Sequence, residues 1–169
     1  LPGKKDVLPV YAVVAFIIQG WTIVKLLWQI PSWGDFLNLG TISGIFAYRI
    51  AAGFFESLVV MTFLLLLSLV FPRIYFKDAF VTRGTAFALT FLGSIMLFWN
   101  RFYSITPGLE MVKIAWGWLI GAICLSWLVS HISVKIHVLQ RVLLGLADRM
   151  VVFLYFLIPK NFNLGVLEH

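Results

Sequence analysis

Charged side chains are scarce in this sequence. Aspartate, glutamate, lysine and arginine make up 12% of its 169 residues, whereas apolar residues make up 62%. Charged residues account for about a quarter of an ordinary soluble domain. So low a share excludes a soluble globular domain and predicts a protein surrounded by a lipid bilayer.

Cysteine and histidine are also rare. Cys124 is the single cysteine, so the chain can form no internal disulfide and no cysteine cluster for zinc. His169 belongs to a C-terminal Leu-Glu-His that matches the start of a vector-derived histidine tag. His131 and His137 are six positions apart, which turns a helix by about 240°, so the two rings point to different faces. The sequence therefore predicts no metal site.

Motifs that carry chemistry are missing as well. The chain has no phosphate-binding loop, no dinucleotide fingerprint, no Cys-x-x-Cys and no Gly-x-Ser-x-Gly. The sequence predicts no cofactor, and it favours a protein that is not an enzyme.

The basic residues are scattered, although the net charge is +6. They separate the apolar runs and do not gather on one face that could follow a phosphate backbone. This distribution predicts no nucleic-acid partner and is typical of topology signals in a membrane protein.

Four apolar runs are long enough to cross a hydrocarbon core about 30 Å thick, which takes about 20 helical residues. They cover about residues 10–30, 50–71, 79–100 and 111–134. Helix start and stop signals flank them: Pro9, Pro31, Pro72, Asp78, Thr106, Pro107 and Glu110. Because the runs are continuous and do not alternate in polarity, they predict helices and not the strands of a barrel.

Short connections between these runs predict an all-α integral membrane protein, with an up-and-down four-helix transmembrane bundle over residues 1–134. Residues 135–159 form an amphipathic segment with Arg141, Asp148 and Arg149 on one face. This segment either lies on the inner membrane surface, which we favour, or crosses the membrane as a fifth span. Residues 160–169 form a tail that includes the tag-like residues.

The two sides of the predicted bundle differ in positive charge. The side of the N-terminus carries Lys4, Lys5, Arg73, Lys77, Arg83, Lys135 and Arg141. The opposite side carries Arg49, Arg101 and Lys113, together with Trp28, Trp33, Trp99, Trp116 and Trp118. Because loops rich in lysine and arginine stay in the cytoplasm, we expect a cytoplasmic N-terminus in a bacterial-type cytoplasmic membrane.

The fourth run contains Gly117 and Gly121 in a Gly-x-x-x-Gly pattern. Small residues at this spacing let two helices approach closely in lipid. The pattern predicts either packing within the chain or a seam for a homo- or hetero-oligomer.

Glu56 is the charge hardest to place, because it lies inside the second run. It shares a helix face with Arg49 and Gly53, so we expect this face to turn toward the bundle. Antiparallel packing brings Lys25 and Arg101 to a similar depth. The sequence therefore predicts a buried polar cluster of Glu56, Lys25, Arg49 and Arg101 in the outer half of the membrane.

Three functions remain open on these grounds. The first is a non-catalytic membrane subunit or scaffold whose membrane charges are structural. The second is a small proton- or ion-coupled transporter or channel that uses Glu56. The third is a membrane enzyme that acts on lipid or quinone, which needs a cavity with at least two convergent polar groups. The first is favoured, because it requires nothing that the sequence does not show.

Overall fold

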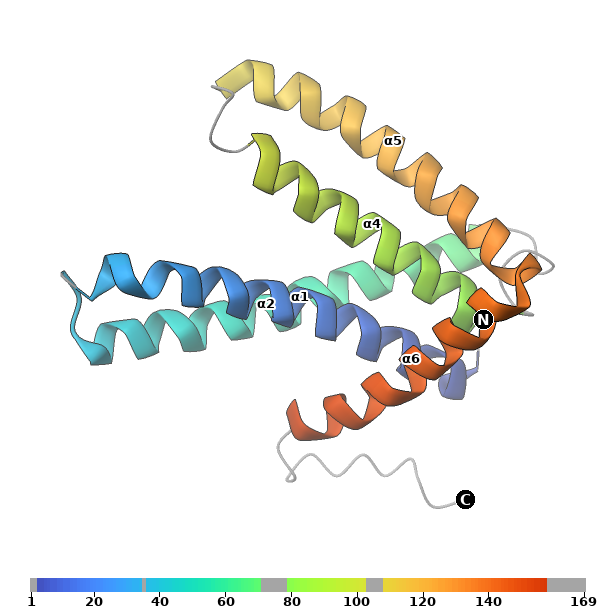
Figure 1. Cartoon of the computed structure of the whole chain (residues 1–169), viewed down its shortest axis with the longest axis horizontal. Coiled ribbons are helices and arrows are strands. Elements are labelled where there is room, and N and C mark those ends of the chain that lie inside the picture. Colours follow the sequence, from blue (N-terminus) through green and yellow to red (C-terminus); the bar gives the residue numbers. More distant parts are fainter. Residues whose placement is uncertain (1–2, 35, 71–78, 103–107, 158–169) are drawn as a thin grey trace.

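The computed structural model describes residues 3–34, 36–70, 79–102 and 108–157, and these ranges are almost wholly helical (Figure 1). Their helices are α1 (Lys4–Trp33), α2 (Leu39–Val70), α4 (Phe80–Phe102), α5 (Gly108–Lys135) and α6 (His137–Leu157).

The helices α1, α2, α4 and α5 are long and apolar enough to cross a membrane. They run alternately up and down (Figure 1), and α6 follows as an additional C-terminal helix. The expected all-α membrane fold with four spans and a further helix is therefore confirmed.

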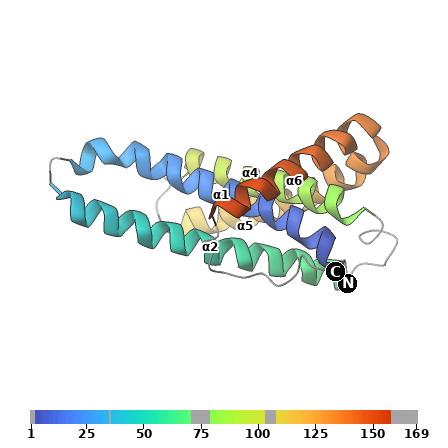
Figure 2. The ribbon, with the colours of Figure 1, turned by 90° about the horizontal axis from the view of Figure 1, so that it is seen from below.

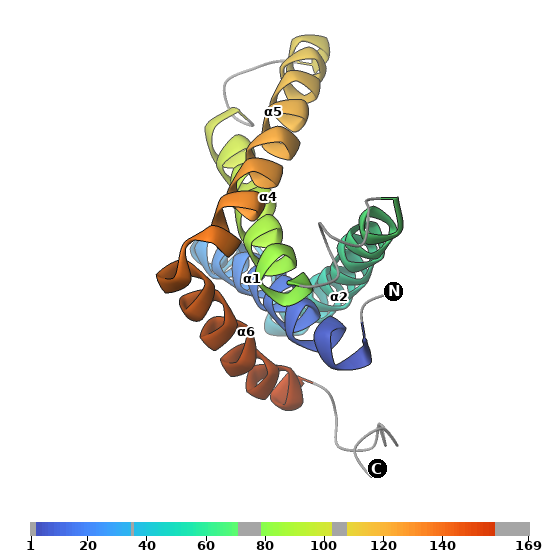
Figure 3. The same cartoon turned by 90° about the vertical axis from the view of Figure 1, so that its right-hand side faces the viewer.

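The four spans form two hairpins, one of α1 and α2 and the other of α4 and α5. The hairpins lie close together near the start of α4 and diverge toward its other end (Figures 1 and 3). The α1–α2 hairpin also extends well beyond the end of α4 (Figures 1 and 2). The result is an open V in place of a closed bundle.

The main apolar core lies where α1, α2 and α4 meet. Its buried members are Val10, Val14 and Ile18 of α1, Met61 and Leu64 of α2, and Phe80, Phe87, Ala88 and Leu92 of α4. Because lipid tails are as apolar as these side chains, the core is stabilised by close van der Waals packing more than by escape from water. Gly84 lets α4 approach α1 closely, since a Cβ there would lie 3.2 Å from a methyl carbon of Val10.

Two helix starts differ from the sequence prediction. Helix α1 begins at Lys4 and continues through Pro9 and Pro31, so neither proline bounds it. Each proline removes one backbone hydrogen bond and strains the preceding turn, which membrane helices tolerate. The predicted bounds 10–30 were therefore too narrow. Pro72, Asp78, Thr106 and Pro107 lie outside the described residues.

Helix α2 begins at Leu39, whereas the sequence predicted a start near residue 50. The reason is a cap: the side-chain oxygen of Asn38 accepts hydrogen bonds from the backbone N–H of Thr41 at 2.8 Å and from its hydroxyl at 2.9 Å. Asparagine is among the best N-cap residues, because its side chain pairs with an N–H that the helix leaves free. Residues 39–49, which precede the predicted apolar run, are therefore part of α2.

Helix α6 starts directly after Ile136 and turns back across the first half of α1 (Figures 1 and 3). Its buried face includes Ala147 and Leu154, and Leu154 packs against Ala12 and Ala15 of α1. The ring of Phe153 meets that of Phe16 edge to face, with centroids 4.9 Å apart. The opposite face is exposed and carries Arg141, Asp148 and Arg149.

We expect Gly84→Ala to weaken the contact of α1 with α4, because the new methyl group would press on Val10. Gly93→Ala on the same helix is the matched control, since a Cβ at Gly93 meets nothing within 4 Å. Both changes add the same helix propensity, so overpacking should place the free energy of unfolding of Gly84→Ala about 1–3 kcal/mol below that of Gly93→Ala.

Thermal unfolding of the detergent-solubilised protein measures this difference. Adding Val10→Ala to Gly84→Ala should recover part of the loss. Equal melting temperatures for Gly84→Ala and Gly93→Ala would show that the two helices do not meet at Gly84.

Candidate functional site

The four charged residues of the predicted cluster lie on three helices. Lys25 is on α1, Arg49 and Glu56 are on α2, and Arg101 is in the last turn of α4. All four side chains are exposed in the isolated chain. Among the described residues, the ion pair that forms is the local one between Glu110 and Lys113 of α5, at 3.1 Å. The structure therefore does not bring Glu56 into an ion pair with any of the three predicted cations.

Lys25 is held by α4 and by its own helix. Its Nζ donates a hydrogen bond to Oδ1 of Asn100 at 3.3 Å and lies 4.7 Å from the centroid of the Trp21 ring. A cation over an indole ring is attracted by the negative face of the ring. The end of α1 and the end of α4 thus meet, as antiparallel packing predicts, but Lys25 reaches an amide of α4 in place of a carboxylate.

Glu56 lies near the middle of α2, with about 26 Å of helix before it and about 21 Å after it at a rise of about 1.5 Å per residue. Its side chain is exposed, whereas the sequence predicted it to be buried. The buried face of α2 follows Gly53, Ser57, Met61 and Leu64. Glu56 precedes Ser57 by one position, about 100° around the helix, so it flanks the contact with α1.

Gln19 fixes that contact, and it is buried in the middle of α1. Its Nε2 donates a hydrogen bond to the carbonyl oxygen of Ile50 at 3.0 Å. Gly53 leaves room for the side chain, because a Cβ there would lie 3.1 Å from Nε2. Gln19 was not among the residues predicted to join helices, although a lone amide in an apolar run often marks a contact between membrane helices.

A second polar contact joins the same two helices about two turns farther along α2, at Ser57. The hydroxyl of Ser57 donates to the carbonyl oxygen of Phe54 at 2.7 Å and lies 3.3 Å from the hydroxyl of Tyr11. Together with the Gln19 hydrogen bond, this contact sets the register of α1 against α2. The register in turn places Glu56 beside α1 and facing α4.

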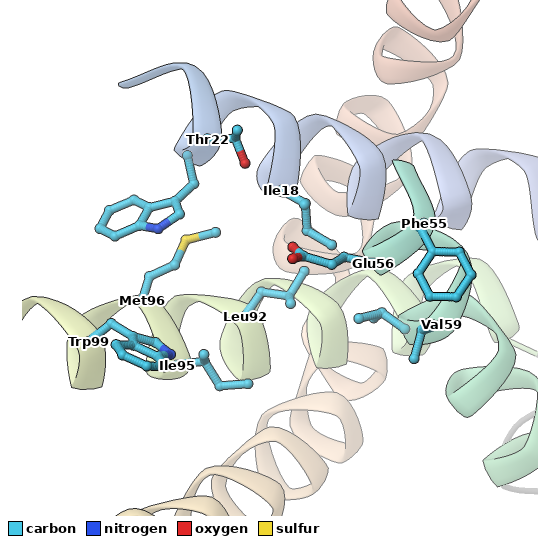
Figure 4. Close-up of a pocket in the computed structure, with 11 residues that line it drawn as sticks. Ile18, Thr22, Phe55, Glu56, Val59, Leu92, Ile95, Met96 and Trp99 are labelled. Atoms are coloured by element: carbon cyan, nitrogen blue, oxygen red, sulfur yellow. The ribbon is translucent and has the colours of Figure 1, made fainter. Parts of the chain in front are cut away.

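Glu56 lines a groove of about 390 Å³ between α1, α2 and α4 (Figure 4). The other lining residues are Ile18, Trp21 and Thr22 of α1, Phe55, Val59 and Val60 of α2, and Leu92, Ile95, Met96 and Trp99 of α4. Figure 4 shows the carboxylate extending from α2 into the space between α1 and α4. The walls are apolar and aromatic, and Glu56 is the one titratable group among these lining residues.

The remaining sequence candidates lie apart from this groove. His131 stacks on Trp127 of its own helix, with ring centroids 6.0 Å apart, and His137 begins α6. Gly117 and Gly121 lie on an exposed face of α5, where added Cβ atoms would meet nothing within 4 Å. In the described part of the chain, no three histidine, cysteine, aspartate or glutamate residues gather closely enough to hold a metal ion.

Comparison of the chain with protein-family models, with curated proteins and with solved structures finds no match.

Proposed function

We propose that this chain is a non-catalytic subunit of a membrane assembly and that it binds its partner through the outer face of α5. The observation that carries the proposal is the open surface at Gly117 and Gly121, where no other part of the described structure packs. In the most apolar stretch of α5, 11% of the residues are buried, whereas 50% are buried in the corresponding stretch of α4.

Helix α5 uses its opposite face to pack against α4. That face includes Ala122, Ser126 and Ser130, all buried, and Ser130 donates a hydrogen bond to the carbonyl oxygen of Arg83 at 3.1 Å. Nearer the outer end, Nε1 of Trp118 donates to the backbone carbonyl of Ser94 at 3.0 Å. The intrachain contact of α5 is therefore complete without the two glycines.

Glycines that face lipid contribute little packing, because they have no side chain for the acyl chains to contact. Against a second helix they permit close approach of the two backbones, which is the main use of this spacing in membranes. Ile120, Leu125 and Leu128 border the two glycines and are exposed. This combination supports a helix partner, either a second copy of the chain or another membrane protein.

The groove beside Glu56 supports a binding role more than an enzymatic one. Its polar side-chain oxygens come from one carboxylate and from the hydroxyl of Thr22. Acid–base catalysis usually needs at least two groups that converge on one reacting atom. A small proton- or ion-coupled transporter that uses Glu56 is the second candidate, because this carboxylate lines an open groove.

The proposed location is a bacterial-type cytoplasmic membrane with the N-terminus inside. In this orientation α6 lies along the inner surface, where its exposed Arg141 and Arg149 would face anionic headgroups.

The assembly role predicts that Gly117→Leu with Gly121→Leu removes the partner, because the added side chains keep the two backbones apart. In native electrophoresis of gently solubilised membranes, the wild-type chain should run in a complex larger than its monomer, and the double variant should run as the monomer. Gly145→Leu is the matched control, since this exposed glycine of α6 also meets nothing within 4 Å. Identical complexes in the wild type and the double variant would contradict the proposal.

Cys124 distinguishes a second copy from another protein, because it lies on the same exposed face as the two glycines. If two copies meet through this face, mild oxidation of isolated membranes should yield a disulfide-linked dimer that Cys124→Ser abolishes. Leu97→Cys with Cys124→Ser is the control, since Leu97 is exposed on α4. A dimer no more abundant than in this control would exclude the second copy as the partner.

The orientation is tested by labelling single cysteines, introduced with Cys124→Ser, on intact cells. Leu39→Cys near the start of α2 should react with a membrane-impermeant maleimide, and Ile136→Cys between α5 and α6 should react only after the cells are permeabilised. Both positions are exposed, so access to the reagent depends on the side of the membrane. The reverse labelling pattern would overturn the orientation.

A further inference from the structure

Glu56 presents to apolar surroundings a carboxylate that forms no ion pair with the described residues. Val59 and Leu92 line the groove beside it. A charged carboxylate in the middle of a membrane helix is costly, because lipid does not solvate its charge. A cation bound next to Glu56 would offset this cost.

The cations of the described chain are engaged or placed elsewhere. Lys25 is held against Asn100 and Trp21. Arg49 is seven positions away on the same helix, about 10 Å along its axis. Arg101 is exposed in the last turn of α4. In this part of the chain the carboxylate therefore has no internal counter-charge.

The walls of the groove suit an organic cation with an apolar body. Trp21 and Trp99 contribute indole rings, which pack against flat apolar groups. Met96 adds a flexible thioether that adapts to irregular shapes. The volume of about 390 Å³ lies in the range of small-molecule sites. We infer that this groove binds a lipophilic organic cation, with Glu56 as its counter-charge.

The charges along the groove also fix the direction in which such a ligand binds. Lys25 lies against Trp21, so the groove is positive near this end and negative at Glu56. The cationic centre therefore lies next to Glu56, and the apolar body extends toward Trp21 and Trp99. An anion of the same shape would be repelled by Glu56. This inference does not depend on any assembly through α5.

The experiment compares two ions of nearly identical shape and opposite charge, tetraphenylphosphonium and tetraphenylborate. Their binding to the purified protein in an uncharged detergent is measured by equilibrium dialysis. The wild type should bind tetraphenylphosphonium, and Glu56→Gln should weaken this binding at least about tenfold, because it removes the counter-charge and keeps the shape. Tetraphenylborate should bind the wild type no better than it binds Glu56→Gln.

Glu110→Gln is the matched control, since Glu110 is exposed on α5 and pairs with Lys113; it should bind tetraphenylphosphonium as the wild type does. Met96→Trp should block the binding of tetraphenylphosphonium, because the larger side chain fills the groove without changing its charge. This variant provides the test if Glu56→Gln does not fold. If Glu56→Gln folds and binds tetraphenylphosphonium with wild-type affinity, the inference is wrong. If Glu56→Gln does not fold, wild-type affinity in Met96→Trp has the same meaning. Equal binding of the two ions by the wild type would also overturn it.

Discussion

The hydrogen bond from Gln19 to the carbonyl oxygen of Ile50 is the interaction on which the rest of the structure depends. Because apolar side chains gain little by leaving lipid for protein, a polar contact inside the membrane strongly determines which residues of two helices face each other. Here it joins α1 and α2, and Gly53 lets the amide fit between them. The same register turns Glu56 toward α4 and thereby creates the groove.

Helix α4 connects the two regions to which a role is proposed. One of its faces lines the groove with Leu92, Met96 and Trp99. On another face of α4, the carbonyl oxygen of Ser94 accepts a hydrogen bond from the indole N–H of Trp118 of α5. A helix partner that moved α5 would therefore act on α4, and α4 forms one wall of the groove. Two roles that rest on separate surfaces are thus linked through a single helix.

The sequence predicted the number and type of the spans, because length and continuous apolar composition suffice for both in a bilayer. It predicted the start of α2 poorly, because it did not include the N-cap at Asn38, which starts the helix well before residue 50. It also assigned Glu56 to the buried face. In a span that is apolar all round, the sequence does not distinguish the side that meets a helix from the side that meets lipid, and Gln19, which does mark the contact, was overlooked.

The unequal lengths of the spans have a mechanical consequence. Helix α1 has 30 residues and α2 has 32, whereas α4 has 23. Spans of different length fit one bilayer by tilting to different degrees, and the required tilt changes with bilayer thickness. The angle between the two hairpins is therefore coupled to the thickness of the surrounding membrane. A thinner bilayer would tilt α1 and α2 more than α4. The width of the groove between these helices would therefore depend on the thickness of the membrane.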